Sequence, residues 1–193
     1  RAIVKEIAER DGIYLANSMN SLRIEGQKTL GMEIVQQFDW EVPDWIVIPG
    51  GNLGNVSALG KGLLEWLELG IIDRLPRICC AQAENANPLY QSYLGGFEKF
   101  EPMQARPTLA SAIRIGDPVH AESVRAAGAT VVTVSDEEIV AAWLELATVE
   151  GLFCEPSSAA GLAAIRRGAV PGDRLAVTIT GHGLKDTESA DRF

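Results

Sequence analysis

The segment IPGGNLGNVSALGKG, residues 48–62, decides how the rest of this chain is interpreted. It follows the apolar run DWIVIP at residues 44–49 and leads into an amphipathic run that ends near Leu69. This order predicts a buried strand, a loop of small residues and a helix. The glycines of the loop leave backbone N–H groups open to an anion, and a helix N-terminus adds positive potential. The segment therefore predicts a phosphate site, although it also fits a strand–helix turn that binds nothing.

The alternation of strand and helix patterns continues along the chain. Short apolar runs predict further strands at residues 13–17, 77–84, 130–134 and 174–180. Helical patterns lie at residues 1–11, 25–38, 121–128, 136–151 and 156–168, with long loops over 85–117. Strands that alternate with helices predict an α/β fold with a mostly parallel sheet and helices on both faces.

The composition limits the classes of function. The chain has 193 residues, 47% of them hydrophobic, and a net charge of -9. An acidic chain without a basic stripe argues against nucleic acid and anionic membranes as partners, and no apolar run is long enough to span a bilayer. The three cysteines, Cys79, Cys80 and Cys154, predict reduced thiols and a cytoplasmic setting. Their spacing does not fit a metal site.

Two further segments carry groups that suit a ligand. NSMNSLRIEGQKT, residues 17–29, is a predicted polar loop in which Arg23 could grip a phosphate, although a solvated loop explains it as well. VTITGHGLKD, residues 177–186, places Thr180 at the carboxyl end of a strand, where open α/β sheets bind ligands. His182 in the same segment fits a turn residue better than an acid or base.

Taken together, these motifs resemble the threonine synthase family. The matching segments, in chain order, are NSMNSLRIEGQKT, GGNLGN, AIRIGDP, EPSSAAGLAA and TGHGLKD. That family belongs to the tryptophan-synthase-β-like group of pyridoxal-phosphate enzymes, fold type II. The resemblance covers essentially the whole chain, and it implies pyridoxal 5'-phosphate as the cofactor and O-phosphohomoserine as the substrate.

The resemblance also implies roles for individual residues. The cofactor phosphate would be bound by the loop residues Gly51, Asn52, Leu53, Gly54 and Asn55. Thr180 would match the residue whose hydroxyl meets the pyridine nitrogen, which leaves that nitrogen largely unprotonated. The substrate's phosphate would be bound by Asn17, Ser18, Arg23 and Asn52.

One family feature is absent from this sequence. The family forms its Schiff base with a lysine in a segment that resembles S-F-K-D, and none of the five lysines has that context: Lys5, Lys28, Lys61, Lys99 and Lys185. The resemblance therefore predicts the C-terminal portion of a threonine synthase, with the catalytic lysine upstream. Residues 1–12 would be the tail helix of a smaller domain, and residues 13–193 the second half of the larger one. A homodimer is expected for the complete protein.

Two other functions remain open at this point. A serine/threonine dehydratase, or a sulfonate-forming relative, would keep the fold and change the reaction, although dehydratases usually carry a run of glycines where this loop has two asparagines. A non-catalytic ligand-binding module would explain the missing lysine.

Overall fold

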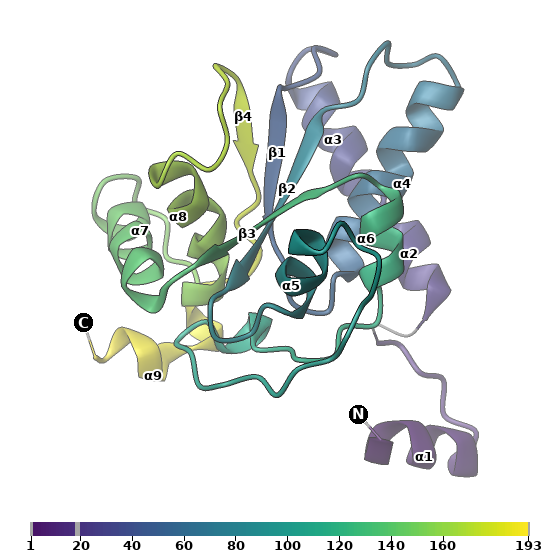
Figure 1. The fold of residues 1–193 in the computed structure, drawn as a ribbon, viewed down its shortest axis with the longest axis vertical. Coiled ribbons are helices and arrows are strands. Elements are labelled where there is room, and N and C mark those ends of the chain that lie inside the picture. The colour runs from purple at the N-terminus through teal and green to yellow at the C-terminus, as the bar shows by residue number, and fades with distance from the viewer. Residues whose placement is uncertain (1, 18–19, 193) are drawn as a thin grey trace.

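The computed structural model describes residues 2–17 and 20–192 of the chain. Within these residues, parallel strands form one sheet in the order β3-β2-β1-β4 (Figure 1). In chain order the strands are β1 (Trp45–Pro49), β2 (Arg77–Ala83), β3 (Thr130–Val134) and β4 (Leu175–Val177). The predicted parallel α/β sheet is thereby confirmed.

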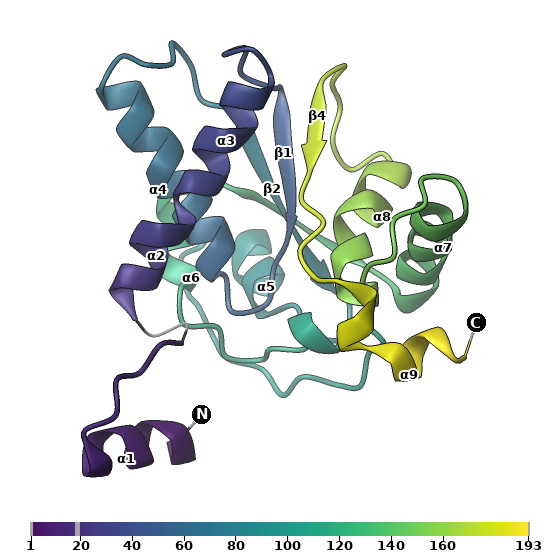
Figure 2. The ribbon, with the colours of Figure 1, turned by 180° about the vertical axis from the view of Figure 1, so that it is seen from behind.

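Helices cover both faces of the sheet, as predicted (Figure 1, Figure 2). Their bounds are α1 (Ala2–Asp11), α2 (Ser21–Gln27), α3 (Thr29–Gln37), α4 (Gly54–Glu68), α5 (Pro88–Leu94), α6 (Ala121–Ala126), α7 (Asp136–Thr148), α8 (Ala160–Arg166) and α9 (Thr187–Ala190). Helices α3, α4 and α6 contribute to the apolar core on one face, and α7 and α8 to the core on the other.

The central strands β1 and β2 contribute side chains to both cores, because successive side chains of a strand point to opposite faces of the sheet. Val47 and Cys79 pack with α7 and α8, whereas Ile46 and Ile78 pack with α3, α4 and α6. All five residues of β1 are buried. Burial of a Val or Ile side chain stabilises a fold by about 1.5–3 kcal/mol, which explains why the apolar run of β1 does not alternate with polar residues.

The predicted start of α7 is confirmed in detail. The Ser135 N–H donates to Glu138 Oε2 at 2.8 Å, and the Glu138 N–H donates to Ser135 Oγ at 3.3 Å. This capping box satisfies two donors that a helix start otherwise leaves without partners.

Three of the predicted local structures are wrong. Residues 13–17 are irregular chain, although they were expected to form a strand. The expected loop over 17–29 contains α2, which begins at Ser21 after the Asn20 side chain accepts the Leu22 N–H at 2.9 Å. This cap forms because asparagine prefers to accept backbone N–H groups at helix starts. The last strand spans only Leu175–Val177 and is half-buried, because it lies at the edge of the sheet.

Helices α2 and α3 pack closely on α4, and this packing sets the position of Arg23. A Cβ atom built on Gly62 of α4 would lie closer than 3.0 Å to the backbone oxygen of Lys28. Lys28 also reaches across to α4, where its Nζ lies 2.7 Å from Glu65 Oε2. The α2 helix is therefore fixed to α4 by a close backbone approach and by an ion pair.

Replacing Gly62 by alanine is expected to lower the free energy of unfolding by about 1–2 kcal/mol. Overpacking typically costs about 1–3 kcal/mol, and alanine recovers up to about 1 kcal/mol of helix propensity. Urea unfolding followed by circular dichroism measures the difference. Gly26→Ala is the matched control, because Gly26 lies in α2 with no heavy atom within 4 Å of its Cβ position. Equal stability of the two variants would contradict the close approach.

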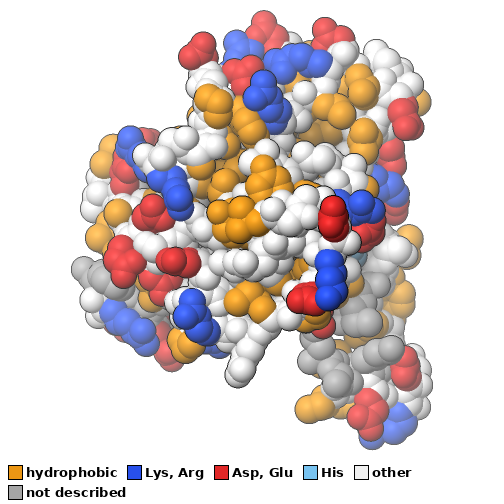
Figure 3. All heavy atoms as spheres, viewed as in Figure 1, with side chains coloured by type: hydrophobic (Ala, Val, Ile, Leu, Met, Phe, Trp, Pro, Cys, Tyr) orange, Lys and Arg blue, Asp and Glu red, His pale blue; other side chains and the backbone are white. Residues whose placement is uncertain are grey.

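Helix α1 stands away from the sheet and its covering helices (Figure 1, Figure 2). Ile3 in this helix is 71% exposed, and Tyr14, in the chain after the helix, is 67% exposed. On the face shown in Figure 3, the described Lys and Arg side chains are interspersed with Asp and Glu. Among the described residues, no helix has both the length and the apolar character needed to cross a bilayer.

The three cysteines are buried free thiols. Burial raises the pKa of Cys79 to about 12 and also raises the pKa of Cys80 and Cys154. These groups stay protonated at neutral pH and serve as small apolar side chains in the two cores.

Candidate active site

The glycine-rich loop, residues 50–55, connects the carboxyl end of β1 to the first turn of α4. Leu53 precedes α4 with a left-handed backbone, at φ 67°. The first N–H groups of a helix lack intrahelical acceptors, so those of α4 are available to a ligand. A Cβ atom at Gly54 would lie in ordinary van der Waals contact with Ile24, Gln27 and His120, at 3.8 Å from each.

Two glycines allow the loop to lie close to its neighbours. The Gly50 N–H donates to the Ala81 carbonyl at 2.8 Å, and a Cβ atom at Gly50 would lie within 3.0 Å of Cys80 Sγ. A Cβ atom at Gly51 would lie 3.0 Å from the Ala112 carbonyl, in a short 3-10 helix (η1, Ser111–Ile113). The loop is thus held between β2 and η1, which gives it one defined backbone path.

A cavity of about 320 Å³ opens next to this loop. It brings together these residues that the sequence predicts for the site: Arg23, Gly51, Asn52, Leu53, Gly54, Asn55 and Thr180. Asn17 is not among the lining residues, and it lies instead in a surface pocket beside α1. Ser18 lies outside the described residues.

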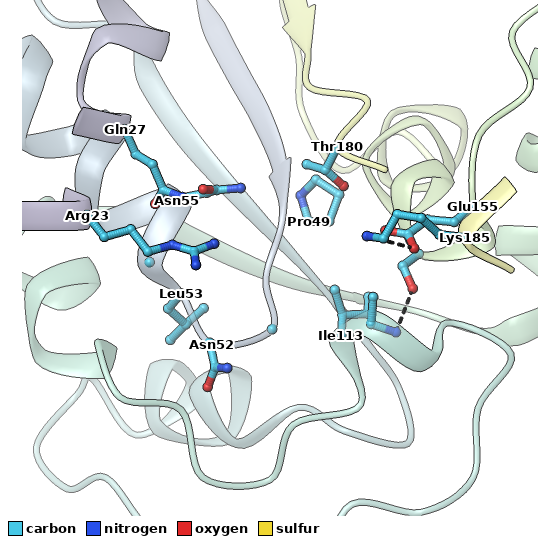
Figure 4. Close-up of a pocket in the computed structure, with 14 residues that line it drawn as sticks. Arg23, Gln27, Pro49, Asn52, Leu53, Asn55, Ile113, Glu155, Thr180 and Lys185 are labelled. Atoms are coloured by element: carbon cyan, nitrogen blue, oxygen red, sulfur yellow. Dashed lines mark hydrogen bonds and ion pairs between the residues drawn. The ribbon is translucent and has the colours of Figure 1, made fainter. Parts of the chain in front are cut away.

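The cavity has two walls with different chemistry. Figure 4 shows Arg23 of α2 and Asn55 of α4 entering from one side, and Glu155 and Lys185 facing them from the other. Thr180 follows β4 and lies on the second side. The predicted ligand-binding side chains Arg23, Asn55 and Thr180 therefore come from three segments that are far apart in the sequence.

A buried serine holds the Thr180 hydroxyl. Ser158 Oγ lies 3.0 Å from Thr180 Oγ1 and accepts the Gly181 N–H at 2.7 Å. Ser158 belongs to a second 3-10 helix (η2, Pro156–Ala159) and is fully buried. The sequence alone does not reveal this role of Ser158, since serines after a proline also fit a helix start.

Glu155 and Lys185 were also missed as members of the site. Glu155 is 6% exposed, lines the cavity and lies 3.5 Å from Lys185 Nζ. Glu155 stands in EPSSAA and Lys185 in TGHGLKD, 30 positions apart in the sequence, and only the fold brings them together. A carboxylate that is buried in a protein usually has a cationic partner. The position of Glu155 next to the small residues of PSSAA is therefore the sequence signal that could have indicated a buried carboxylate with a partner such as Lys185.

The remaining candidates have structural partners. His182 Nδ1 accepts the Leu184 N–H at 3.1 Å at the start of a third 3-10 helix (η3, Gly183–Lys185), which agrees with the turn role that the sequence favoured. The described residues contain no group of three or more His, Cys, Asp or Glu side chains that could hold a metal ion.

A model of one protein family matches residues 1–181, and its description is pyridoxal-phosphate dependent enzyme. The chain belongs to the pyridoxal-phosphate-dependent enzymes. Membership makes pyridoxal phosphate the cofactor of the family site, and the resemblance identified from the motifs is confirmed at this level.

Curated relatives of this pyridoxal-phosphate-dependent enzyme are threonine synthases. One from Arabidopsis thaliana, a chloroplastic threonine synthase 2, is 48% identical over 97% of this chain and 38% of its own length. Another from Methanosarcina acetivorans is 44% identical over 97% of this chain and 49% of its own length. The chain thus spans about half, or less, of the length of these relatives.

Solved structures share the fold. Threonine deaminase isoform 2 from Solanum lycopersicum superposes with a TM-score of 0.78 at 18% identity, over 97% of this chain and 53% of its own. Maize serine racemase gives a TM-score of 0.76 at 22% identity, over 100% of this chain and 60% of its own. Both likenesses identify the fold-type II architecture.

The cavity fits the cofactor of this family. A phosphate group needs N–H donors and positive potential, which the start of α4 offers at the cavity. A pyridine nitrogen needs one hydrogen-bonding group, and the Thr180 hydroxyl lines the cavity wall opposite Arg23. These residues could therefore hold pyridoxal phosphate.

Proposed function

We propose that this chain carries the cofactor-phosphate side of a threonine synthase active site. The complete protein would convert O-phosphohomoserine and water to threonine and phosphate. The observation that carries the proposal is a single cavity that is lined by residues of the GGNLGN loop, by Arg23 and by Thr180. The threonine synthase names of relatives at 40–48% identity support the same reaction.

In this proposal the loop residues Gly51, Asn52, Leu53, Gly54 and Asn55 bind the cofactor phosphate. The N–H groups at the start of α4 supply donors and positive potential for it. Thr180 offers its hydroxyl to the pyridine nitrogen. When bound, the cofactor supplies an electron sink for the bonds at the amino-acid carbon atoms.

Arg23 and Asn52 bind the phosphate that leaves the substrate. A guanidinium binds phosphate through paired N–H donors, which orients the leaving group and stabilises its charge. Asn17 and Ser18 were assigned to the same phosphate by resemblance. Asn17 lies beside α1 in this structure, so the proposal rests on Arg23 and Asn52.

The Schiff-base lysine is proposed to lie outside this sequence. Lys185 is the one lysine that lines the cavity among the residues that the structure describes, and its ammonium group lies 3.5 Å from the buried Glu155 carboxylate. Lys185 also stands in TGHGLKD, and not in a segment that resembles S-F-K-D. Lys185 therefore serves to neutralise Glu155 at the wall.

The decisive experiment uses the complete protein loaded with pyridoxal phosphate. Incubation with O-phosphohomoserine is expected to release phosphate and threonine in equal amounts. Incubation with threonine or serine is expected to give little of the corresponding 2-oxo acid. Formation of 2-oxobutyrate from threonine, without phosphate release from O-phosphohomoserine, would replace the proposal by its alternative.

That alternative is a serine/threonine dehydratase. The structural likeness to threonine deaminase and serine racemase favours it at the level of the fold. The asparagines at positions 52 and 55 of the loop, and the threonine synthase relatives, favour the first reaction. A non-catalytic binding module ranks third, and turnover of either substrate would exclude it.

We further propose that α1 belongs to a smaller domain and that the complete protein is a cytoplasmic homodimer. The exposed apolar residues of α1 support the first point, since side chains such as Ile3 gain stability when another domain covers them. The three free thiols support a reducing compartment. The dimer rests on the family resemblance.

A further inference from the structure

Ser158 lies directly behind the Thr180 side chain and does not line the cavity. It is fully buried, so bulk water has no access to its hydroxyl. The Ser158 N–H donates a hydrogen bond to the Glu155 carbonyl at 2.9 Å. The Glu155 N–H in turn donates to the Gly181 carbonyl at 2.9 Å. The segments 155–158 and 180–181 are therefore tied together by backbone and side-chain bonds.

The direction of the hydrogen bonds at Ser158 follows from counting protons. A serine hydroxyl has one proton to donate and two lone pairs to accept with. Its oxygen accepts the Gly181 N–H at 2.7 Å. Its own proton has two acceptors within reach, Thr180 Oγ1 at 3.0 Å and the Gly181 carbonyl at 3.3 Å.

Thr180 is the better of these two acceptors. The Gly181 carbonyl already accepts the Glu155 N–H, and its distance from Ser158 Oγ exceeds the usual range for O–H···O bonds. The Thr180 oxygen is closer. The Ser158 proton therefore points to Thr180, and the Thr180 proton is left to point elsewhere.

We propose that Ser158 is a positioning residue that makes the Thr180 hydroxyl a hydrogen-bond donor toward the cavity. The relay runs from the Gly181 N–H to Ser158, from Ser158 to Thr180, and from Thr180 to the ligand. A donor at this place selects a ring nitrogen that carries no proton. The inference rests on the proposed assignment of Thr180 to the pyridine nitrogen, and it adds the residue that sets the polarity of this contact.

The relay strengthens the Thr180 donor in two ways. A hydroxyl that accepts one hydrogen bond becomes a better donor in the next, because the bonds polarise each other. Burial of Ser158 prevents water from offering an alternative partner. Without Ser158, no hydrogen bond would orient the Thr180 proton toward the cavity, and the hydroxyl could turn and accept a proton from a protonated ring nitrogen.

The test uses the complete protein with pyridoxal phosphate that carries ¹⁵N in the ring. The ¹⁵N chemical shift reports the protonation of that nitrogen directly and does not depend on turnover. In the unaltered protein we expect the unprotonated signal throughout the neutral pH range. Thr180→Asp provides the protonated reference, since a carboxylate holds a proton on the nitrogen.

Ser158→Ala is expected to move the ¹⁵N signal toward the protonated reference. Ser158→Cys keeps the shape of the side chain with a weaker donor, and its signal is expected to move in the same direction by a smaller shift. This second variant also covers the case in which alanine impairs folding, because the Gly181 N–H keeps a possible partner. The control is Ser92→Ala, because the Ser92 hydroxyl is also buried but donates to the Lys99 carbonyl at 2.7 Å and does not line the cavity; its signal should stay unchanged.

An unchanged signal in Ser158→Cys, with a protonated signal in Thr180→Asp, would overturn the role of Ser158 and leave the proposed reaction intact. An unchanged signal in Thr180→Asp would overturn both the relay and the assignment of Thr180 to the ring nitrogen. The assay for phosphate and threonine release decides the proposed function separately.

Discussion

Replacing Arg23 by alanine in the complete protein is expected to raise the KM for O-phosphohomoserine on the order of one hundredfold. Hydrogen bonds to charged groups contribute about 1.5–3 kcal/mol, which corresponds to this range of affinity. Arg23 lines the cavity from α2, a helix that does not carry the glycine-rich loop. Its loss should therefore weaken binding of the substrate much more than binding of the cofactor, because the N–H groups of α4 still bind the cofactor phosphate.

Steady-state kinetics and a titration with pyridoxal phosphate together measure this difference. Arg23→Lys keeps the charge and loses the paired donors, so its KM should lie between those of the other two proteins. The matched control is Arg125→Ala in α6, because Arg125 pairs with Glu122 on the surface and does not line the cavity. Equal weakening of cofactor and substrate in Arg23→Ala would remove Arg23 from its proposed role.

Replacing Gly50 by alanine is expected to destabilise the fold by about 3 kcal/mol and to weaken cofactor binding. Overpacking of a core costs typically about 1–3 kcal/mol, and the upper end applies because the obstacle cannot move easily. The new Cβ atom would lie within 3.0 Å of Cys80 Sγ, a fully buried atom on the central strand β2. The loop would have to shift away from β2, and the N–H groups at the start of α4 would shift with it.

A second substitution tests this explanation. Cys80→Ala removes the sulfur atom, after which the nearest neighbour of the new Cβ atom is Leu53 Cδ2 at 3.1 Å. The double variant Gly50→Ala/Cys80→Ala is therefore expected to bind pyridoxal phosphate better than Gly50→Ala alone. Urea unfolding and cofactor titration of both variants and of Cys80→Ala complete the cycle. Additive losses would mean that the sulfur atom is not the obstacle.

Much of the fold was predictable because it follows from local patterns. The runs at β1 and β2 are short and mostly apolar, and nearly all of their residues are buried, as in strands covered on both faces. The capping box of Ser135 and Glu138 depends only on two residues three apart. Each of these features is encoded within a window of a few residues, which a single sequence displays directly.

The wrong predictions concern segments whose structure depends on distant neighbours. The apolar residues at 13–17 predict a strand, but the sheet offers them no partner among the described residues, and Tyr14 stays exposed. The polar segment before Glu25 was taken for a loop. It forms α2 because Gly62 of α4 allows the chain at Lys28 to approach closely, and an amphipathic pattern of seven residues is too short to reveal this.

The candidate site divides in the same way. The loop residues Gly51 to Asn55 were found because strand, glycines and helix follow one another directly in the chain. Arg23 and Thr180 were found through motifs that resemble a family. The partners that fix the second wall were not found: Ser158 behind Thr180, and Lys185 beside Glu155.

The sequence by itself determined the α/β architecture, the glycine-rich loop and the family resemblance, because these depend on the order and spacing of neighbouring residues. Only the tertiary structure decided which groups meet across the cavity. Ser158 and Thr180 are 22 residues apart, and their hydroxyls lie 3.0 Å apart because η2 packs against the end of β4. Hydrogen bonds of this kind act over a few ångströms in space, so the spacing of residues along the chain carries no record of them.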